Sequence, residues 1–215
     1  MQNEDVKDRR SRLSDVKRAL LEKRLRGEQF VLPEKEQIRP LPRRESAPLS
    51  FAQQRLWFID QLEPGNPAYT FPLMVRLSGR LDRAALRQAL DEIVRRHEVL
   101  RTTFPWIDGR PVQAVSPPSP LGLPLIDISE LPEAVREQEA RRLANEDRRR
   151  PFDLARGPVF RVCLVRLGPE EHALFFTLHH IVSDIWSVGV LAREVGALYM
   201  AFTAGRPSPL PELPV

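Results

Sequence analysis

The pattern of apolar and polar residues predicts four helices after the first 45 residues. Apolar side chains recur at helical spacing from Leu49 to Leu62, where Ser50 can cap the first turn. A second stretch runs from Asp82, itself a capping candidate, to Leu100. The charged segment 133–148 and the apolar segment from Trp186 to Phe202 show the same spacing. We therefore expect a helix in each of these four places.

Shorter apolar segments predict strands between these helices. They lie at 74–78, 102–106, 112–115, 158–167 and 172–180. Asp108-Gly109 separates the second and third of them, and this dipeptide is a strong hairpin signal. Strands that alternate with helices indicate an α/β fold in which helices cover a mixed sheet.

Residues 1–45 have a different pattern and are expected to form an appendage to a single domain over 46–215. Ser14 can cap a short helix whose narrow apolar stripe contains Leu20 and Leu25, and Gly27 can end it. Prolines at 33, 40, 42 and 48 then indicate an extended linker. We expect a basic helix and a proline-rich linker, which serve as a docking element or as a brace.

Charge and composition narrow the classes of function. The formal net charge is +4, and arginines and lysines crowd the first helix, but no aromatic residue precedes Phe30. A nucleic-acid site would combine basic and stacking side chains, so a solvated helix face is the preferred interpretation and no nucleic acid is expected. No signal peptide and no bilayer-length apolar run is recognised, and Cys163 is the single cysteine. A cytoplasmic protein without a membrane partner is expected.

The segment from Leu178 to Ser187 carries the most informative chemistry. His179 and His180 point to opposite faces if the strand continues, which disfavours a shared zinc ion. His180 then shares a face with Leu174, Phe176 and Leu178 and is the polar end of an apolar row. A neutral imidazole at a strand end can act as a general base, and Asp184 lies near the next helix N-terminus. The residues alone equally allow a buried structural histidine and an ordinary helix cap.

A family resemblance favours the catalytic interpretation. Residues 179–185 resemble the His-His-x-x-x-Asp-Gly signature of condensation domains and the chloramphenicol-acetyltransferase-like superfamily, and Trp186-Ser187 matches the peptide synthetase form. Residues 50–58 and 96–104 resemble the first two motifs of the same family, and 151–158 is typical of it. The resemblance covers residues 46–215. It implies the N-terminal lobe of a two-lobed chloramphenicol-acetyltransferase-like fold.

The resemblance also implies roles for individual residues. His180 would face the acceptor amine and deprotonate or orient it during amide bond formation, while His179 would be structural. Asp184 would be architectural, in an ion pair with Arg96 or, as second choice, Arg101. The flanking residues Trp186 and Ser187 would support the site, and the opening-motif aromatics Trp57 and Phe58 are expected in the core.

The family context implies partners rather than a bound cofactor. Substrates would arrive on the phosphopantetheine arms of carrier protein domains, and no cofactor or metal would be held directly. Further partners would be the C-terminal lobe of the condensation domain and an adenylation or polyketide synthase module. Because the active site of the family lies between two lobes, this chain is expected to be inactive alone.

One position departs from the family signature. Ile185 occupies the place of the motif glycine, and a β-branched side chain there would stiffen the turn and narrow the way to His180. Two alternatives therefore accompany amide synthesis. One is a degenerate module that only docks carriers, and the other is a stand-alone acyltransferase of the same superfamily.

Overall fold

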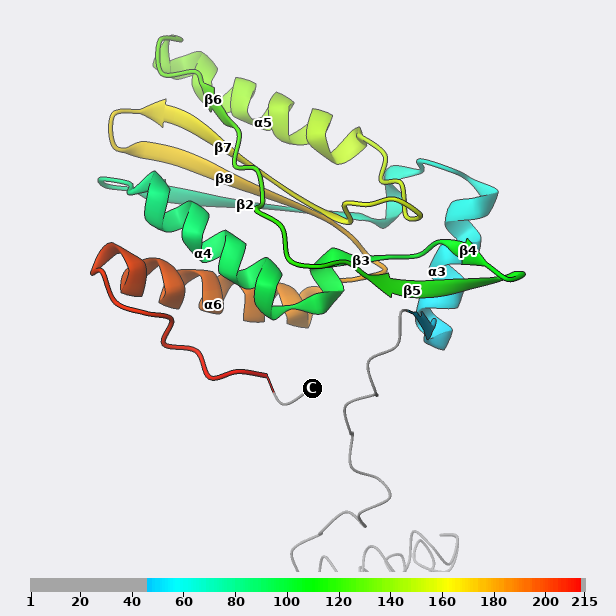
Figure 1. Cartoon of the computed structure of the whole chain (residues 1–215). Coiled ribbons are helices and arrows are strands. Elements are labelled where there is room, and N and C mark those ends of the chain that lie inside the picture. The colour runs from blue at the N-terminus through cyan, green and yellow to red at the C-terminus, as the bar shows by residue number, and fades with distance from the viewer. Residues whose placement is uncertain (1–45, 214–215) are drawn as a thin grey trace, which may run out of the picture. The chain divides into compact units, whose positions relative to one another are not determined.

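The computed structural model describes residues 46–213 of the chain, which fold around a four-stranded mixed sheet (Figure 1). The predicted basic helix and most of the linker lie outside these residues. The sheet has the strand order β2-β8-β7-β6, with bounds Thr70–Ser78 for β2, Leu125–Asp127 for β6, Phe160–Gly168 for β7 and Glu171–His179 for β8. The pairs β2/β8 and β7/β8 are antiparallel, whereas β6 runs parallel to β7. The α/β fold expected from the sequence is confirmed.

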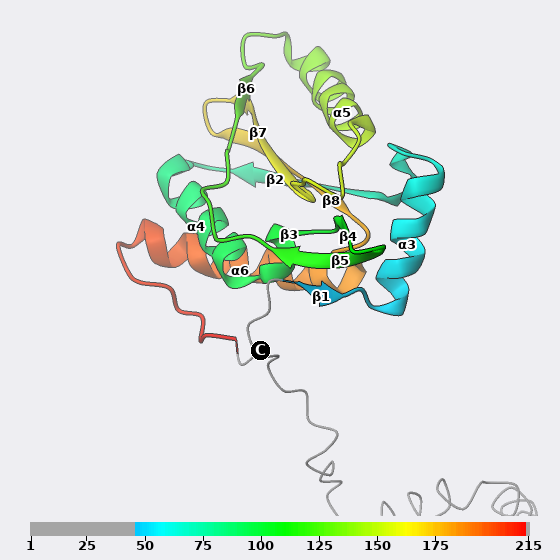
Figure 2. The same cartoon turned by 45° about the vertical axis from the view of Figure 1, so that its right-hand side comes forward.

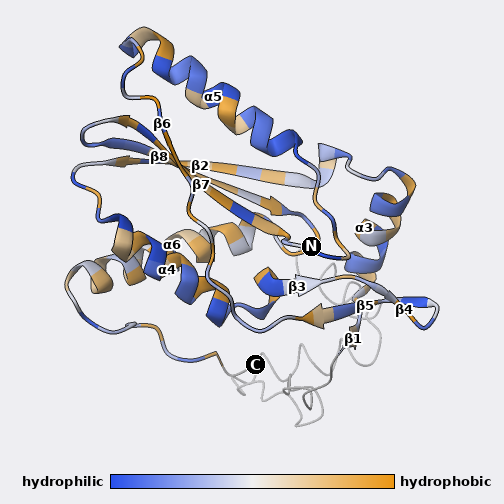
Figure 3. Ribbon diagram, turned by 45° about the horizontal axis from the view of Figure 1, so that its top comes forward, coloured by the Kyte–Doolittle hydropathy of each residue, from blue (hydrophilic) through white to orange (hydrophobic). Residues whose placement is uncertain are grey.

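Helices cover both faces of this sheet. Helices α4 (Arg83–Arg96) and α6 (Ile185–Thr203) pack together on one face, and α5 (Glu133–Arg149) lies on the other (Figure 1). Leu174, Phe176 and Leu178 of β8 join the α4 and α6 core, and the alternate residues Ala173 and Phe175 face α5. The period-2 alternation therefore assigned the faces of β8 correctly. Figure 3 shows α5 as mainly hydrophilic, as expected of a helix with one covered face.

A smaller sheet stands beside the end of the main one (Figure 2). It contains β1 (Ala47–Pro48), β3 (Thr102–Thr103), β4 (Trp106–Ile107) and β5 (Arg110–Val115), and helix α3 (Phe51–Leu62) accompanies it. The predicted hairpin is present between β4 and β5. Asp108 and Gly109 have φ angles of 50° and 77°, the left-handed conformations that a two-residue hairpin turn requires. Two short 3-10 helices, η2 (Pro67–Tyr69) and η3 (Glu98–Arg101), complete the elements.

The helix starts were predictable because their capping side chains are used. Ser50 begins α3 with a reciprocal capping box, and the Asp82 carboxylate accepts the N–H groups of Ala84 and Ala85 at the start of α4. The predicted end of this second helix was too late, because α4 stops at Arg96 and η3 follows as a separate turn.

Three features differ from the sequence-based expectations. Strand β2 begins at Thr70, four residues earlier than predicted, and β6 and β1 were not predicted at all. Of the two opening-motif aromatics, Trp57 packs against the core near Phe104, as expected; it donates its indole N–H to the Phe104 carbonyl (3.0 Å) and stacks on Trp106. The core assignment of Phe58 was wrong, since 58% of this residue is exposed.

Helix α6 is long and apolar enough to cross a membrane by length and composition, with a mean hydropathy of 1.3. In the structure it serves as a core helix. Its buried residues recur every three or four positions; they are Val188, Leu191, Val195, Leu198 and Ala201. Leu191, Val195 and Leu198 share a core cluster with residues of α4 and the sheet.

Candidate active site

The candidate site is centred on the turn that follows β8. The strand ends at His179, and His180 begins the connection to α6 with its backbone N–H still bonded to the Tyr69 carbonyl of η2 (2.8 Å). His179 is buried at 4% exposure, whereas His180 is exposed. The two neighbouring imidazoles therefore lie in opposite environments at the strand end, as the strand alternation predicted.

A backbone carbonyl selects the tautomer of the neutral His180 ring. Nδ1 lies 2.5 Å from the carbonyl oxygen of Ser183. A carbonyl oxygen only accepts hydrogen bonds, so Nδ1 must donate its proton and Nε2 of the neutral ring must hold the free lone pair. The exposed ring thus has its basic nitrogen available for a substrate proton.

His179 has the opposite tautomer. Its Nδ1 accepts the backbone N–H of Ile181 (3.1 Å), so the proton of its neutral ring is on Nε2. Burial, and secondarily the neighbouring His180, lowers the pKa of His179 to about 4. The ring also meets the edge of Phe152 at a centroid distance of 6.0 Å. These contacts assign His179 a structural place inside the fold.

Hydrogen bonds back to His179 hold the turn in shape. The His179 carbonyl accepts the Val182 N–H and the Ser183 hydroxyl, both at 3.1 Å. Because Ser183 in turn supplies the carbonyl that binds His180, the conformation of the turn decides the orientation of the exposed ring.

Asp184 and Ser187 begin α6 with a capping box. The Asp184 carboxylate accepts the Ser187 N–H (2.7 Å), and the Ser187 hydroxyl accepts the Asp184 N–H (2.8 Å). The backbone N–H and then the hydroxyl of Ser187 hold the pKa of Asp184 below its usual value. The predicted position of Asp184 at a helix N-terminus is confirmed.

The expected ion pair between Asp184 and Arg96 or Arg101 is wrong for this structure. Arg96, the last residue of α4, instead places Nε 3.2 Å from Glu194 Oε2, and only 5% of its side chain is exposed. His97 Nε2 lies 2.6 Å from the same oxygen. Arg101 contacts Glu98 and the Ser116 carbonyl. Asp184 lies at the exposed N-terminus of α6. Glu194, the carboxylate that pairs with Arg96 at the end of α4, lies in the middle of α6.

Ile185 and Trp186 stand exposed directly after the cap, at 78% and 79%. Neither side chain contributes to the core of residues 46–213. The isoleucine at the motif glycine is therefore accommodated without disturbing the fold, and both apolar side chains remain available for contact at the rim of the site.

An apolar hollow of about 180 Å³ lies on the α6 side of the turn. Its lining comes from the end of α4, η3, β8, the turn and α6, and consists of His97, Val99, Leu100, Leu178, Val182, Ser183, Trp186, Ser187, Val188, Val190 and Leu191. His180 is outside this lining. Within residues 46–213, no three His, Cys, Asp or Glu side chains are arranged to hold a metal ion.

Sequence reasoning missed four contributors to this region. Glu194 had no local signal, because its partners Arg96 and His97 lie almost one hundred residues earlier. The carbonyls of Tyr69 and Ser183 position His180 through backbone atoms, which any residue type could supply. Phe152 belonged to a recognised motif, but its contact with His179 required the fold.

Comparison with known proteins gives a consistent result. The family model described as condensation domain matches residues 43–215. Among curated proteins, the chain is 50% identical over 177 residues to chondramide synthase cmdD of Chondromyces crocatus, covering 82% of this chain and 4% of that protein. It is 43% identical over 216 residues to phosphinothricin tripeptide synthetase PhsC of Streptomyces viridochromogenes, covering 99% of this chain and 20% of that protein. The chain thus spans a small part of these relatives.

Solved structures agree with the sequence relatives. The X-domain from teicoplanin biosynthesis superposes with a TM-score of 0.72 at 33% identity, over 82% of this chain and 37% of that one. The first condensation domain of the calcium-dependent antibiotic synthetase, solved with a substrate analogue, gives 0.70 at 32% identity, over 77% and 39%. The chain spans about two fifths of each solved chain.

Proposed function

Because the chain belongs to the condensation-domain family of nonribosomal peptide synthetases, we propose that it supplies the catalytic histidine for amide bond formation. The substrates would be an acyl or aminoacyl thioester donor and an aminoacyl acceptor, each tethered to a carrier protein domain. The observation that carries this proposal is the exposed His180 ring whose Nδ1–H is bound by Ser183, which leaves Nε2 as the base.

The proposed reaction needs one proton acceptor. The amine nitrogen of the acceptor attacks the thioester carbonyl carbon while His180 Nε2 accepts its proton. The carbon–sulfur bond then breaks, and the departing phosphopantetheine thiolate recovers a proton from the imidazolium. General-base help of this kind contributes roughly 10²- to 10⁴-fold in rate. Positioning the two tethered ends contributes more, since effective molarities of well-oriented groups reach roughly 10⁵–10⁸ M.

The partners follow from this reaction. Donor and acceptor carrier domains would bring the two thioesters, a C-terminal lobe would face the exposed rim of the site, and adenylation or polyketide synthase modules would load the carriers. No cofactor would be bound directly by this chain, since the phosphopantetheine belongs to the carriers. The setting we propose is cytoplasmic.

The test measures the condensation product by intact mass. A condensation domain that contains these residues is incubated with an acyl-loaded donor carrier and an aminoacyl-loaded acceptor carrier. We expect the acceptor to gain the donor mass, and His180→Ala to reduce the rate by roughly 10²- to 10⁴-fold. His172→Gln is the matched control, because it changes a histidine near the start of β8, paired with Leu77, at the end of the strand away from His180. Equal product from His180→Ala and wild type would overturn the proposal.

A non-catalytic carrier-docking module is the second candidate, and Ile185 is the observation that favours it. This exposed β-branched residue lies five positions after the catalytic candidate, where the family signature has glycine. If wild type forms no product and Ile185→Gly does, this second candidate replaces the first. Product from wild type excludes it.

A further inference from the structure

We propose that Arg161 is a positioning residue for His180 and acts through Phe152 and His179. This inference rests on the proposed function only in taking His180 as the base. Its structural part can be measured without turnover.

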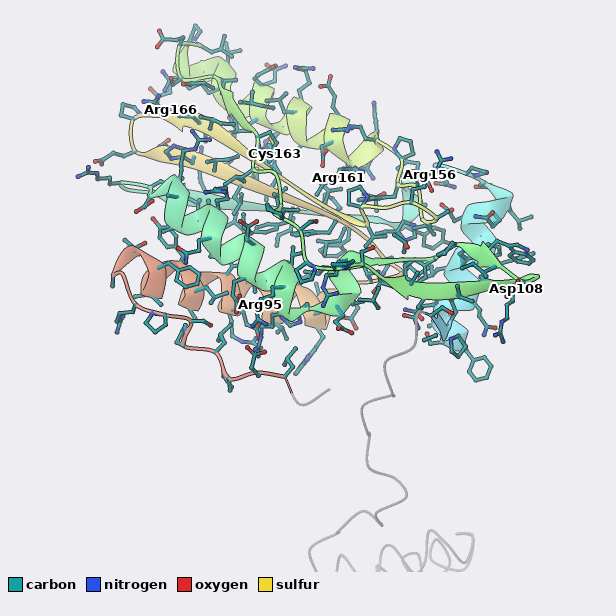
Figure 4. All side chains as sticks on the ribbon, viewed as in Figure 1. Arg95, Asp108, Arg156, Arg161, Cys163 and Arg166 are labelled. Carbon is teal, nitrogen blue, oxygen red and sulfur yellow. The ribbon has the colours of Figure 1, made fainter. Side chains whose placement is uncertain are left out.

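Arg161 binds backbone carbonyls at the C-terminal end of α5. It lies on β7 where the strand passes this end of the helix (Figure 4). Its Nη2 donates to the carbonyls of Asp147 (2.8 Å) and Arg150 (3.0 Å), and its Nη1 donates to the carbonyl of Pro151 (3.3 Å). Helix C-termini leave such carbonyls unpaired and favour a cation. With 15% of its side chain exposed, Arg161 fixes where the chain leaves α5.

The same guanidinium fixes the ring of Phe152, the residue directly after Pro151. Arg161 Cζ lies 3.9 Å from the ring centroid of Phe152, which is the geometry of a cation–π contact. The same ring also contacts His179, whose imidazole plane stands at 85° to it. Phe152 also shares a buried cluster with Ile181 and Val182 of the turn. The ring therefore joins the arginine to the turn that carries His180.

His179 transmits this position to the catalytic candidate. Its ring nitrogen binds the Ile181 N–H, and its carbonyl binds the Ser183 hydroxyl. Ser183 then supplies the carbonyl for His180 Nδ1. Without Arg161, the Phe152 ring loses the cation that restrains it, and the imidazole of His179 loses its fixed neighbour. The Ser183 carbonyl would then no longer select one tautomer of His180.

A purely stabilising role for Arg161 predicts something different. Removing the arginine would then lower the free energy of unfolding, but the folded molecules would keep the His180 ring unchanged. The tautomer of the His180 ring in the folded protein separates the two roles.

The test is nitrogen NMR of the whole chain with ¹⁵N-labelled imidazoles, which reports the nitrogen of His180 that carries the proton. We expect Nδ1–H in wild type and a severalfold lower ratio of Nδ1–H to Nε2–H in Arg161→Met. Arg166→Met is the matched control, because Arg166 lies on the same strand but pairs with Asp127 (3.2 Å) at 41% exposure. Figure 4 places it toward the opposite end of the strand. The control should keep the wild-type ratio.

The conservative variant and the rate give a second readout. Lysine keeps the cation but not the planar fork that reaches three carbonyls, so Arg161→Lys should lie between wild type and Arg161→Met. In the condensation assay, Arg161→Met should lower kcat about 10- to 100-fold at unchanged KM, as expected for a displaced catalytic group.

An unchanged His180 ratio in folded Arg161→Met would overturn the inference. If that variant does not fold, Phe152→Leu provides the same decision, because it removes the ring and keeps the arginine. Loss of the Nδ1–H preference in Phe152→Leu supports the inference, and its retention overturns it. Activity in His180→Ala would instead refute the proposed function and leave the NMR result intact.

Discussion

At the scale of single residues, two adjacent histidines lie in opposite environments, His179 buried and His180 exposed. Successive strand residues face opposite sides, so one imidazole enters the core while the next reaches solvent at the strand end. His179 accepts a backbone N–H and His180 donates to a backbone carbonyl, which gives the two rings opposite tautomers. The backbone of this four-residue turn thus orients both rings without a side-chain partner.

The buried ring makes the stability of the fold depend on pH. The pKa of His179 is about 4 in the folded protein, below the ordinary value of 6.5, so the unfolded chain binds more protons between these values. The stabilisation from the neutral ring is complete above pH 6.5 and is lost as the pH falls toward 4. By linkage it amounts to about 3 kcal/mol. The free energy of unfolding in urea, compared at pH 7 and pH 4.5, measures most of this loss.

The variant His179→Asn isolates this contribution. Asparagine keeps an acceptor for the Ile181 N–H but does not titrate in this range. Between pH 7 and pH 4.5 the variant should therefore lose less unfolding free energy than wild type. Parallel pH profiles for the two proteins would show that His179 is not held neutral by the fold.

At the scale of elements, a buried charge cluster joins α4 to α6. Glu194 binds Arg96 and His97 together, and the Arg96 side chain is 5% exposed. Replacing Glu194 with alanine leaves the arginine buried without its counterion, which costs about 3–5 kcal/mol. The pair of Glu92 with Arg95 is the matched control, because the Arg95 side chain is 42% exposed and keeps a second partner in Glu212; Glu92→Ala should cost less than about 1 kcal/mol. Urea midpoints of the two variants give the comparison, and equal shifts would contradict it.

The start of α6 should be more tolerant. Asp184 caps the helix from an exposed position and has no arginine partner among residues 46–213. Asp184→Ala should therefore lower the urea midpoint less than Glu194→Ala. Asp184→Ser, which keeps a capping oxygen, should stay close to wild type. A larger loss in Asp184→Ala than in Glu194→Ala would restore the ion pair expected from the family motif.

Local signals explain which elements could be predicted. The hairpin followed from Asp108-Gly109, and three helices began at residues whose side chains cap them; these are Ser50, Asp82 and Asp184. The strand β6 has three residues, too few to show a period, and it is defined by its parallel pairing with β7. The partner of Arg96 was misassigned because it also depends on a contact distant in sequence. Only the packing of α4 on α6 brings Glu194 to Arg96.

At the scale of the whole described fold, the order β2-β8-β7-β6 places β7 and β8 inside the sheet. These strands are paired on both sides and covered by helices on both faces, so they should open only with global unfolding. Native-state hydrogen exchange should find the slowest amides there and faster exchange in the two-residue strands β1 and β4. Faster exchange in β7 and β8 than in the hairpin would contradict this core.

The same arrangement places the exposed ring at a rim that the fold itself leaves open. The interior strand β8 delivers His180, and α6 begins immediately beyond it with the exposed Ile185 and Trp186. A rigid strand and a capped helix therefore hold the turn from both ends. Among residues 46–213, the His180 ring is exposed at this rim, where the partners proposed above would bind.

The most direct test compares single-turnover rates of amide formation for His180→Ala and His179→Asn in the same condensation domain. If the exposed ring is the base and the buried ring only shapes the turn, His180→Ala should lose roughly 10²- to 10⁴-fold. Folded His179→Asn should retain far more of the wild-type rate. A rate for His180→Ala equal to that of wild type would contradict the account.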